Sequence, residues 1–167
     1  MARALVPILD ARLVLYKTYL ELDNEVKVIV RTDPTSQRLM TVPGVGCVTA
    51  LTFKAAVDEP ARFKSSRTVA AHFGLTPRRF QSGQTDSPGH SSRAGDPEVR
   101  SALYVAAHAL VTRTQAWSRL KSWGMRLVKT RGHHRAVIAM ARKLAVILHR
   151  MWIRGTDFQW GSKEATP

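Results

Sequence analysis

The chain has 167 residues, and its charge balance is its most unusual property. Lys and Arg number 26 against 12 Asp and Glu, so the formal net charge is +14 and the pI is near 11.1. With 44% hydrophobic residues the chain can bury a core, and its positive charge predicts a polyanionic partner, most simply nucleic acid.

Several classes of protein are disfavoured by the same composition. The single cysteine, Cys47, excludes an internal disulfide, and the lack of a Cys/His cluster with zinc spacing predicts no metal site in this chain. Lys and Arg interrupt the longest apolar stretches, so we expect neither a membrane span nor export. We therefore expect a cytoplasmic, nucleoid-associated protein.

The positive charge is unevenly distributed along the chain. Residues 1–42 hold six basic and five acidic side chains, whereas residues 43–167 hold twenty and seven. The second part is therefore the part that we expect to bind the polyanion.

The first element predicted is a long amphipathic helix over residues 4–31. Its apolar positions alternate in steps of three and four residues. They are Leu9, Leu13, Tyr16, Leu20 and Val30. Asp23 and Lys27 interrupt this seam, so the pattern fits either a helix that pairs with another copy or one that packs on its own domain.

A short helix and a glycine-rich turn follow. Asp33 is a typical N-cap residue and Pro34 is a typical first helical residue, so this pair predicts a short helix that ends before Pro43. The VPGVG turn that follows resembles a helix-hairpin-helix motif, in which Gly44 and Gly46 allow the backbone to approach a phosphate at the start of the next helix. A helical hairpin without a ligand explains the same residues.

The remaining pattern predicts an all-α or mainly α fold. Helices are expected over 47–57, 66–73, about 115–130 and about 133–153, with another beginning at Asp96-Pro97. Residues 74–95 are expected to form an irregular loop or a short β-hairpin. In the helix at 115–130, Trp117 and Trp123 are expected to point inward, because tryptophans at helical spacing favour core packing over base stacking.

A candidate site lies in the glycine-rich segment 74–100. Ser82 precedes Gly83, and a serine beside glycine can present its hydroxyl on a tight turn. Arg78 and Arg79 can hold phosphate oxygens, which suits nucleophilic attack on a phosphodiester. The alternative is that Ser82 is an ordinary turn residue and that the arginines form a solvated face.

A series of motifs carries a family resemblance. In order, these are VPGVG at 42–46, DEPARF at 58–63, GLTPRRFQSG at 74–83, GHSSRAGD at 89–96, VR at 99–100 and ARKLAVILHRMW at 141–152. Over residues 39–160 they resemble the C-terminal domain of the IS110, or Piv-type DEDD, family of bacterial transposases. Residues 1–38 resemble the end of that family's coiled-coil linker, and residues 161–167 are expected to form a flexible tail.

The resemblance implies a role for individual residues. It implies Ser82 as the nucleophile that forms a covalent phosphoserine link with DNA, with Ser92 as the runner-up. Four arginines would hold the scissile phosphate or neutralise the charge of the transition state. They are Arg78, Arg79, Arg93 and Arg100.

The resemblance also implies partners that this sequence does not supply. Full-length members join such a domain to a RuvC-like domain, whose four acidic residues bind Mg²⁺, and some members use a structured guide RNA. Since the 167 residues hold no such acidic constellation, we expect a chain that binds DNA but does not recombine alone. We also expect a homo-oligomer, dimer or tetramer, formed through the first helix. The competing hypotheses are a non-catalytic helix-hairpin-helix module and a basic structural protein.

Overall fold

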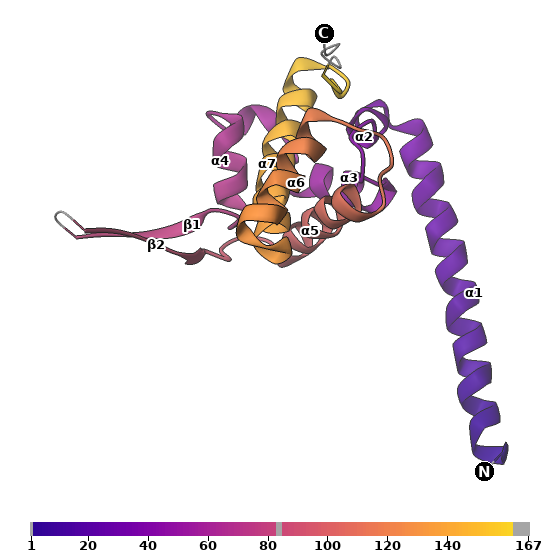
Figure 1. The fold of residues 1–167 in the computed structure, drawn as a ribbon. Helices are drawn as coiled ribbons and strands as arrows, with labels where there is room; N and C mark the ends of the chain where they lie inside the picture. Colours follow the sequence, from indigo (N-terminus) through magenta and orange to yellow (C-terminus); the bar gives the residue numbers. More distant parts are fainter. Residues whose placement is uncertain (1, 83–84, 162–167) are drawn as a thin grey trace, which may run out of the picture. The chain divides into compact units, whose positions relative to one another are not determined.

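The fold is mainly α-helical, as expected, with one small antiparallel sheet (Figure 1). The computed structural model describes residues 2–82 and 85–161, and it describes side chains for residues 5–78 and 89–161. The elements in chain order are α1 (Ala2–Thr32), α2 (Pro34–Met40), α3 (Cys47–Val57), the 3-10 turn η1 (Pro60–Arg62), α4 (Ser66–His72), β1 (Pro77–Ser82), β2 (Thr85–Ser91), α5 (Pro97–Thr112), α6 (Arg119–Arg131) and α7 (His133–Arg154). The predicted tail at 161–167 falls almost wholly outside the described residues.

The chain divides into two compact units, Met1–Pro34 and Thr35–Pro167. The first unit is the single helix α1, which begins at Ala2, so that Pro7 lies inside the helix. Proline has no N–H, and the carbonyl one turn before it therefore lacks its usual helical donor. The division into a linker, a transposase domain and a tail stays a prediction.

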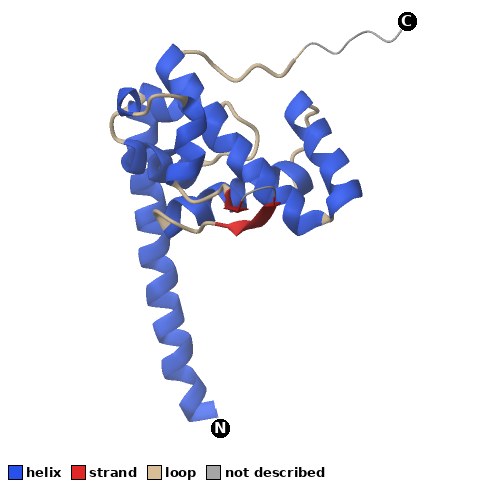
Figure 2. Cartoon of the chain, turned by 90° about the vertical axis from the view of Figure 1, so that its left-hand side faces the viewer, coloured by secondary structure: helices blue, strands red, loops and turns tan. Residues whose placement is uncertain are grey.

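The core of the second unit is organised around α7. Helices α4, α5 and α6 pack against α7, and α3 packs against α5; Figure 2 shows helices around the two strands. Nine residues of α7 are buried, recurring every three or four positions, whereas its cationic side chains are exposed. The buried residues include Val137, Met140, Ala141, Leu144 and Leu148, whereas Trp152 near the end of the helix is half-buried.

Helix starts follow local capping chemistry. The Asp96 carboxylate accepts from the backbone N–H groups of Glu98 (2.7 Å) and Val99 (3.4 Å), which begins α5 where the sequence indicates. Ser118 caps α6 in the same way by accepting from the Lys121 N–H at 3.1 Å. The predicted start of α6 near residue 115 is therefore wrong: the helix begins at Arg119 because the cap lies at Ser118.

A buried histidine joins α7 to the segment before α4. The His149 side chain is fully buried, with Nε2 2.9 Å from the Pro60 carbonyl oxygen and Nδ1 3.0 Å from the Ser66 hydroxyl. Because a carbonyl only accepts, Nε2 carries the proton and Nδ1 accepts from Ser66. The Phe63 ring packs edge-to-face on the imidazole at 5.4 Å, so His149 is an interior residue with both ring nitrogens satisfied.

Of the two alternatives expected for residues 74–95, an irregular loop or a short β-hairpin, the structure has the β-hairpin. Strands β1 and β2 are antiparallel, with Pro77 opposite Ser91 and Ser82 opposite Thr85. At the base, Gly74 has φ +65°, and a Cβ there would lie 2.2 Å from the Ala94 carbonyl oxygen. Only glycine fits such a contact. Gly74 therefore lets the segments before β1 and after β2 come into backbone contact at the base of the hairpin, where it leaves the helices (Figure 1).

Candidate nucleic-acid interface

The hairpin separates the two candidate serines. Ser82 is the last residue of β1, whereas Ser92 follows β2 at the base, where its N–H donates to the Thr76 carbonyl at 2.8 Å. Ser82 lies six residues beyond Thr76 along an extended strand, so the serines are roughly 20 Å apart. One phosphate therefore cannot contact both. The side chain of Ser82 and residue Gly83 lie outside the described residues, so the nucleophile assignment stays a prediction.

The four predicted arginines occupy different places on and below the hairpin. Arg78 lies in β1 and donates from Nη2 to the Ser92 carbonyl at 3.2 Å. Arg93 is exposed, with φ +53°. Arg100 on α5 donates from Nη1 to the carbonyls of Ala94 and Gly95, both at 2.9 Å, and thereby fastens the base of the hairpin to α5. The side chain of Arg79 lies outside the described part of β1.

These contacts give Arg78 and Arg100 a structural role on the hairpin's base. Both side chains donate to backbone carbonyls in the segment that follows β2. A guanidinium has five N–H donors, so such bonds leave donors for a phosphate. The predicted phosphate contacts of the four arginines are compatible with this geometry and stay predictions.

The two glycines of the VPGVG turn have different surroundings. Gly44 has φ +88°, and a Cβ there would lie 2.5 Å from the Ala106 carbonyl oxygen of α5. This residue therefore lets the turn pack directly on a helix backbone. A Cβ on Gly46, the N-cap of α3, would meet nothing within 4 Å in the described structure. Gly46 is thus the glycine that leaves room for a ligand at the α3 N-terminus, beside the exposed Val48.

Gly46 lies in the connection between two helices: α2 ends at Met40 and α3 begins at Cys47. The connection has the outline of a helical hairpin, and the first turn of α3 has no acidic residue. The assignment of a phosphate-binding helix-hairpin-helix motif stays a prediction.

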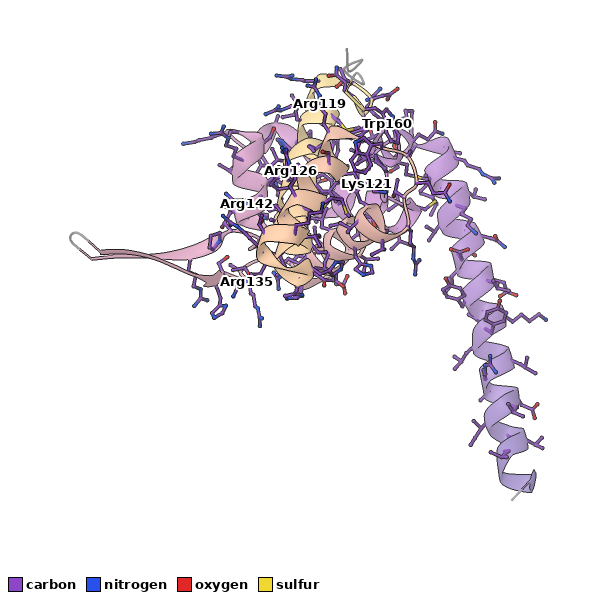
Figure 3. The ribbon with its side chains drawn as sticks, viewed as in Figure 1. Arg119, Lys121, Arg126, Arg135, Arg142 and Trp160 are labelled. Carbon is purple, nitrogen blue, oxygen red and sulfur yellow. The ribbon has the colours of Figure 1, made fainter. Side chains whose placement is uncertain are left out.

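A cationic surface lies on α6 and α7, which pack along each other. Figure 3 shows Arg119 and Arg126 on α6, with Arg135 and Arg142 of α7 on the same side of the unit. The members of each pair are seven residues apart, two helical turns, so they share a face and are roughly 10 Å apart along the axis. All four side chains are exposed.

The charge of this surface is not offset by nearby acids in the sequence. Residues 99–156 contain twelve Lys and Arg and not one Asp or Glu. Three acids lie at the two ends of this stretch: Asp96 caps α5, Glu98 lies in the first turn of α5, and Asp157 lies 3.8 Å from the Arg38 guanidinium. A surface with one sign of charge attracts a polyanion and holds its backbone without reading its sequence.

Trp117 is placed differently from the sequence-based expectation. This residue, expected to point inward, lies in the loop before α6 and is 59% exposed. Trp160 near the C-terminus is also exposed, at 41%. Trp123 is half-buried and stacks under the Lys143 ammonium at 4.2 Å. Periodicity fails for Trp117 because this residue precedes the cap and is not part of the helix.

Among the described residues, no group of three or more His, Cys, Asp or Glu side chains could hold a metal ion. These residues therefore do not fit the Mg²⁺ site that the resemblance implies. Among the same residues no helix is long and apolar enough to cross a membrane.

The motifs and this geometry agree with a comparison to known families. A profile of the Transposase IS116/IS110/IS902 family matches residues 36–122. The chain belongs to this family. The matched region includes the VPGVG turn, the entire hairpin and the Ser118 cap of α6, whereas much of the cationic surface lies beyond it.

Several transposases are similar over most of the chain. The transposase of insertion sequence IS1111A from Coxiella burnetii is 32% identical over 141 residues, covering 84% of this chain and 39% of that protein. The transposase of IS1328 from Yersinia enterocolitica is 34% identical over 140 residues, covering 83% and 42%. The pilin gene-inverting protein of Moraxella bovis is 32% identical over 95 residues, covering 52% and 29%. The chain thus spans about two fifths of the length of the transposases it matches.

Proposed function

We propose that this transposase-family chain binds DNA and contributes Ser82 as the nucleophile for strand cleavage and exchange. The observation that carries the proposal is the position of Ser82 in a family that includes transposases: it ends β1, at the far end of a hairpin whose base is fastened to the helices by Arg100 and Gly74. A nucleophile in this position can reach a duplex that lies against the unit without disturbing the core.

The proposed chemistry conserves bonds and needs no external energy source. Attack of the Ser82 Oγ on a phosphodiester forms one P–O bond and breaks another, and the leaving deoxyribose oxygen takes a proton as the serine loses one. Attack by the hydroxyl of a second strand reverses these changes and frees the serine. Arginine side chains at the hairpin would stabilise the charge on the pentavalent phosphorus.

Binding is proposed to come from the cationic surface on α6 and α7. The twelve Lys and Arg of residues 99–156, with no acid among them, support contact with a nucleic-acid backbone. The same surface would suit a structured guide RNA, the second nucleic-acid partner that the family resemblance implies. The cytoplasmic, nucleoid-associated location follows from the same proposal.

Self-association is proposed to use α1. Leu9, Leu13, Tyr16 and Leu20 are all exposed along this helix, although they are apolar and lie at heptad-like spacing. Asp23 and Lys27, which interrupt the seam, form an ion pair with each other along the helix. The seam therefore tolerates both residues, and we propose that a second copy of the chain covers it.

A covalent trap tests the nucleophile. The chain is incubated with DNA carrying the ends of an insertion sequence and Mg²⁺, with and without the acidic domain of a relative supplied in trans. We expect an adduct that resists denaturation, that Ser82→Ala abolishes and that Ser92→Ala retains. Retention of the adduct in Ser82→Ala would overturn the assignment.

The same experiment separates the competing function. If no combination yields an adduct while the chain binds DNA tightly and in a salt-sensitive way, the chain is a non-catalytic helix-hairpin-helix nucleic-acid-binding module. The helical hairpin formed by α2 and α3, with its open Gly46, is the feature that favours this second candidate.

A further inference from the structure

Two exposed tryptophans belong to segments that lie beside the first turn of α6. The Arg119 N–H donates to the Trp160 carbonyl at 3.3 Å, and Trp117 lies only two residues before Arg119. This bond brings the C-terminal segment beside the loop that precedes α6. Both indoles are more than two fifths exposed, so the core does not account for either of them.

Local folding does not require the Trp117 ring. Trp117 occupies the position before the Ser118 cap, where an apolar side chain usually packs on the fourth residue of the helix. That fourth residue is Ser122, which is polar, so the usual packing partner is missing. The loop is held by other bonds: Ser118 caps the helix, and the Lys121 ammonium donates to the Thr114 carbonyl.

The Trp160 ring is held in place by its neighbours. Phe158 packs edge-to-face on it, with ring centroids 5.4 Å apart and an interplanar angle of 79°. The Phe158 N–H donates to the Thr41 hydroxyl at 2.9 Å, which ties this segment to the end of α2. Trp160 is therefore an aromatic side chain on a fixed support.

A cation lies near each tryptophan. The Lys121 ammonium lies 5.8 Å from the centroid of the Trp117 ring. Arg119 is bonded through its backbone to Trp160, and a Cβ on the next residue, Gly161, would lie 2.7 Å from the Arg119 Cδ. Figure 3 shows Arg119 beside Trp160, with Lys121 to their lower right and Arg126, Arg142 and Arg135 to their lower left. The aromatic pair thus lies at one end of the cationic surface.

We propose that Trp117 and Trp160 form a stacking surface for unpaired bases of a single-stranded nucleic acid whose phosphates contact Arg119 and Lys121. Exposed aromatic rings interleaved with cations are the means by which proteins hold single strands without reading sequence. Bases in a duplex are already stacked on each other, so the indoles would discriminate in favour of an unpaired stretch. This inference rests on the proposed nucleic-acid binding but not on the chemistry of Ser82.

The charge decides between a nucleic acid and a protein as the occupant. Tryptophan and arginine are also enriched in protein interfaces. Here, however, Trp117 lies within residues 99–156 and Trp160 follows shortly after them. Residues 99–160 hold twelve Lys and Arg but one acid, Asp157. A polyanion that also offers aromatic faces fits both properties, and a nucleic-acid strand is such a polyanion.

Binding to three labelled probes tests the inference: oligothymidylate and oligouridylate of about 15 nucleotides, and a duplex of the same length. Fluorescence anisotropy with the full chain measures each affinity. We expect Trp117→Ala to weaken binding to single strands by roughly five- to hundredfold and to leave duplex binding within about twofold. We expect Trp160→Ala also to weaken single-strand binding and to spare duplex binding. Whichever of oligothymidylate and oligouridylate loses more affinity identifies the sugar of the preferred strand.

Three controls make the result specific. Trp117→Phe keeps an aromatic face and retains most of the single-strand affinity, whereas Lys121→Gln weakens binding to all three probes. Val105→Ala, at an exposed apolar residue of α5, changes none of them. Equal losses on single strands and duplex, or no loss in either tryptophan variant, would overturn the inference. Ser82→Ala keeps the wild-type preference, so the loss of an adduct and the loss of stacking are separate results.

Discussion

Helices α1 and α7 are the longest in the described structure, and they use their apolar side chains in opposite ways. Helix α7 buries nine residues along one face and exposes cations on the other. Helix α1 carries a similar three-and-four spacing of apolar residues, yet Leu13 is 65% exposed and its neighbours along the seam are exposed as well. The spacing alone therefore does not say whether a helix belongs to a core.

The difference lies in the partners that each helix has. Three helices of the same unit pack on α7, so its burial is intramolecular and contributes directly to folding. Helix α1 is a unit by itself, and its apolar face gains stability only from a second surface. Helix α7 therefore stabilises the folded unit, whereas we propose that α1 mediates association between two copies of the chain.

The largest contrast is expected for leucine truncation in the two helices. Leu144→Ala in α7 leaves a cavity in a fully buried site and should lower the free energy of unfolding by about 2–5 kcal/mol. Leu13→Ala in α1 should change it by less than about 0.5 kcal/mol. Denaturant titration of both variants at low protein concentration measures these values, and equal losses would show that α1 belongs to the core after all.

A second contrast lies within α7. His149→Leu empties a fully buried polar position and removes the partner of the half-buried Pro60 carbonyl and Ser66 hydroxyl, which should cost roughly 2–4 kcal/mol. His133→Leu, at the exposed start of the same helix, should be close to neutral. Thermal melts of the two variants compare them. A stable His149→Leu protein would mean that Ser66 and Pro60 find other partners.

The charges of the two helices form the third contrast. Arg135→Gln combined with Arg142→Gln should lower affinity for duplex DNA about tenfold and reduce the slope of log K against log salt by about 2. The control removes two positive charges from α1, through Arg12→Gln and Lys17→Gln, and should alter the slope far less. A similar effect in both variants would mean that binding follows net charge and not the surface on α6 and α7.

The smallest effect on folding is expected for a charge in the α1 seam. Leu13→Glu should leave the unfolding of the Thr35–Pro167 unit unchanged but weaken self-association, because a carboxylate would enter a helix-pairing surface. Sedimentation velocity measures the mass of the variant against that of the wild type. Val14→Glu, outside the seam defined by Leu9, Leu13, Tyr16 and Leu20, is the matched control.

Local signals predicted much of the secondary structure. The bounds 47–57 agree with α3, and Asp96-Pro97 marks the start of α5, because capping and proline placement act within a few residues of each other. The hairpin was one of two alternatives for residues 74–95. The start of α6 was missed because the apolar spacing at Trp117 and Leu120 concealed the Ser118 cap.

Only part of the candidate site could be predicted from the sequence. The serine-glycine motif and the arginines around it could be identified from the sequence, but their distances from one another could not. The cationic surface combines residues of α6 and α7. These residues face the same way because of how the two helices pack, which the sequence does not show. Exposure of Trp117 and Trp160 could not be read from spacing either, since Trp160 reaches α6 through a hydrogen bond from Arg119 across 41 residues of sequence.

The sequence was enough for the mainly helical class, the positive charge of the second unit, the capped start of α5 and the motifs of the transposase family. These depend on composition or on neighbours along the chain. Only the folded structure shows that Gly44 packs on α5 and that Ser82 and Ser92 lie at opposite ends of a hairpin. It also shows that α7 is core, whereas Leu9, Leu13, Tyr16 and Leu20 of α1 are exposed and only Val30 of that seam is buried. Burial and distance depend on which distant segments meet, and the spacing of residues along one segment does not contain that information.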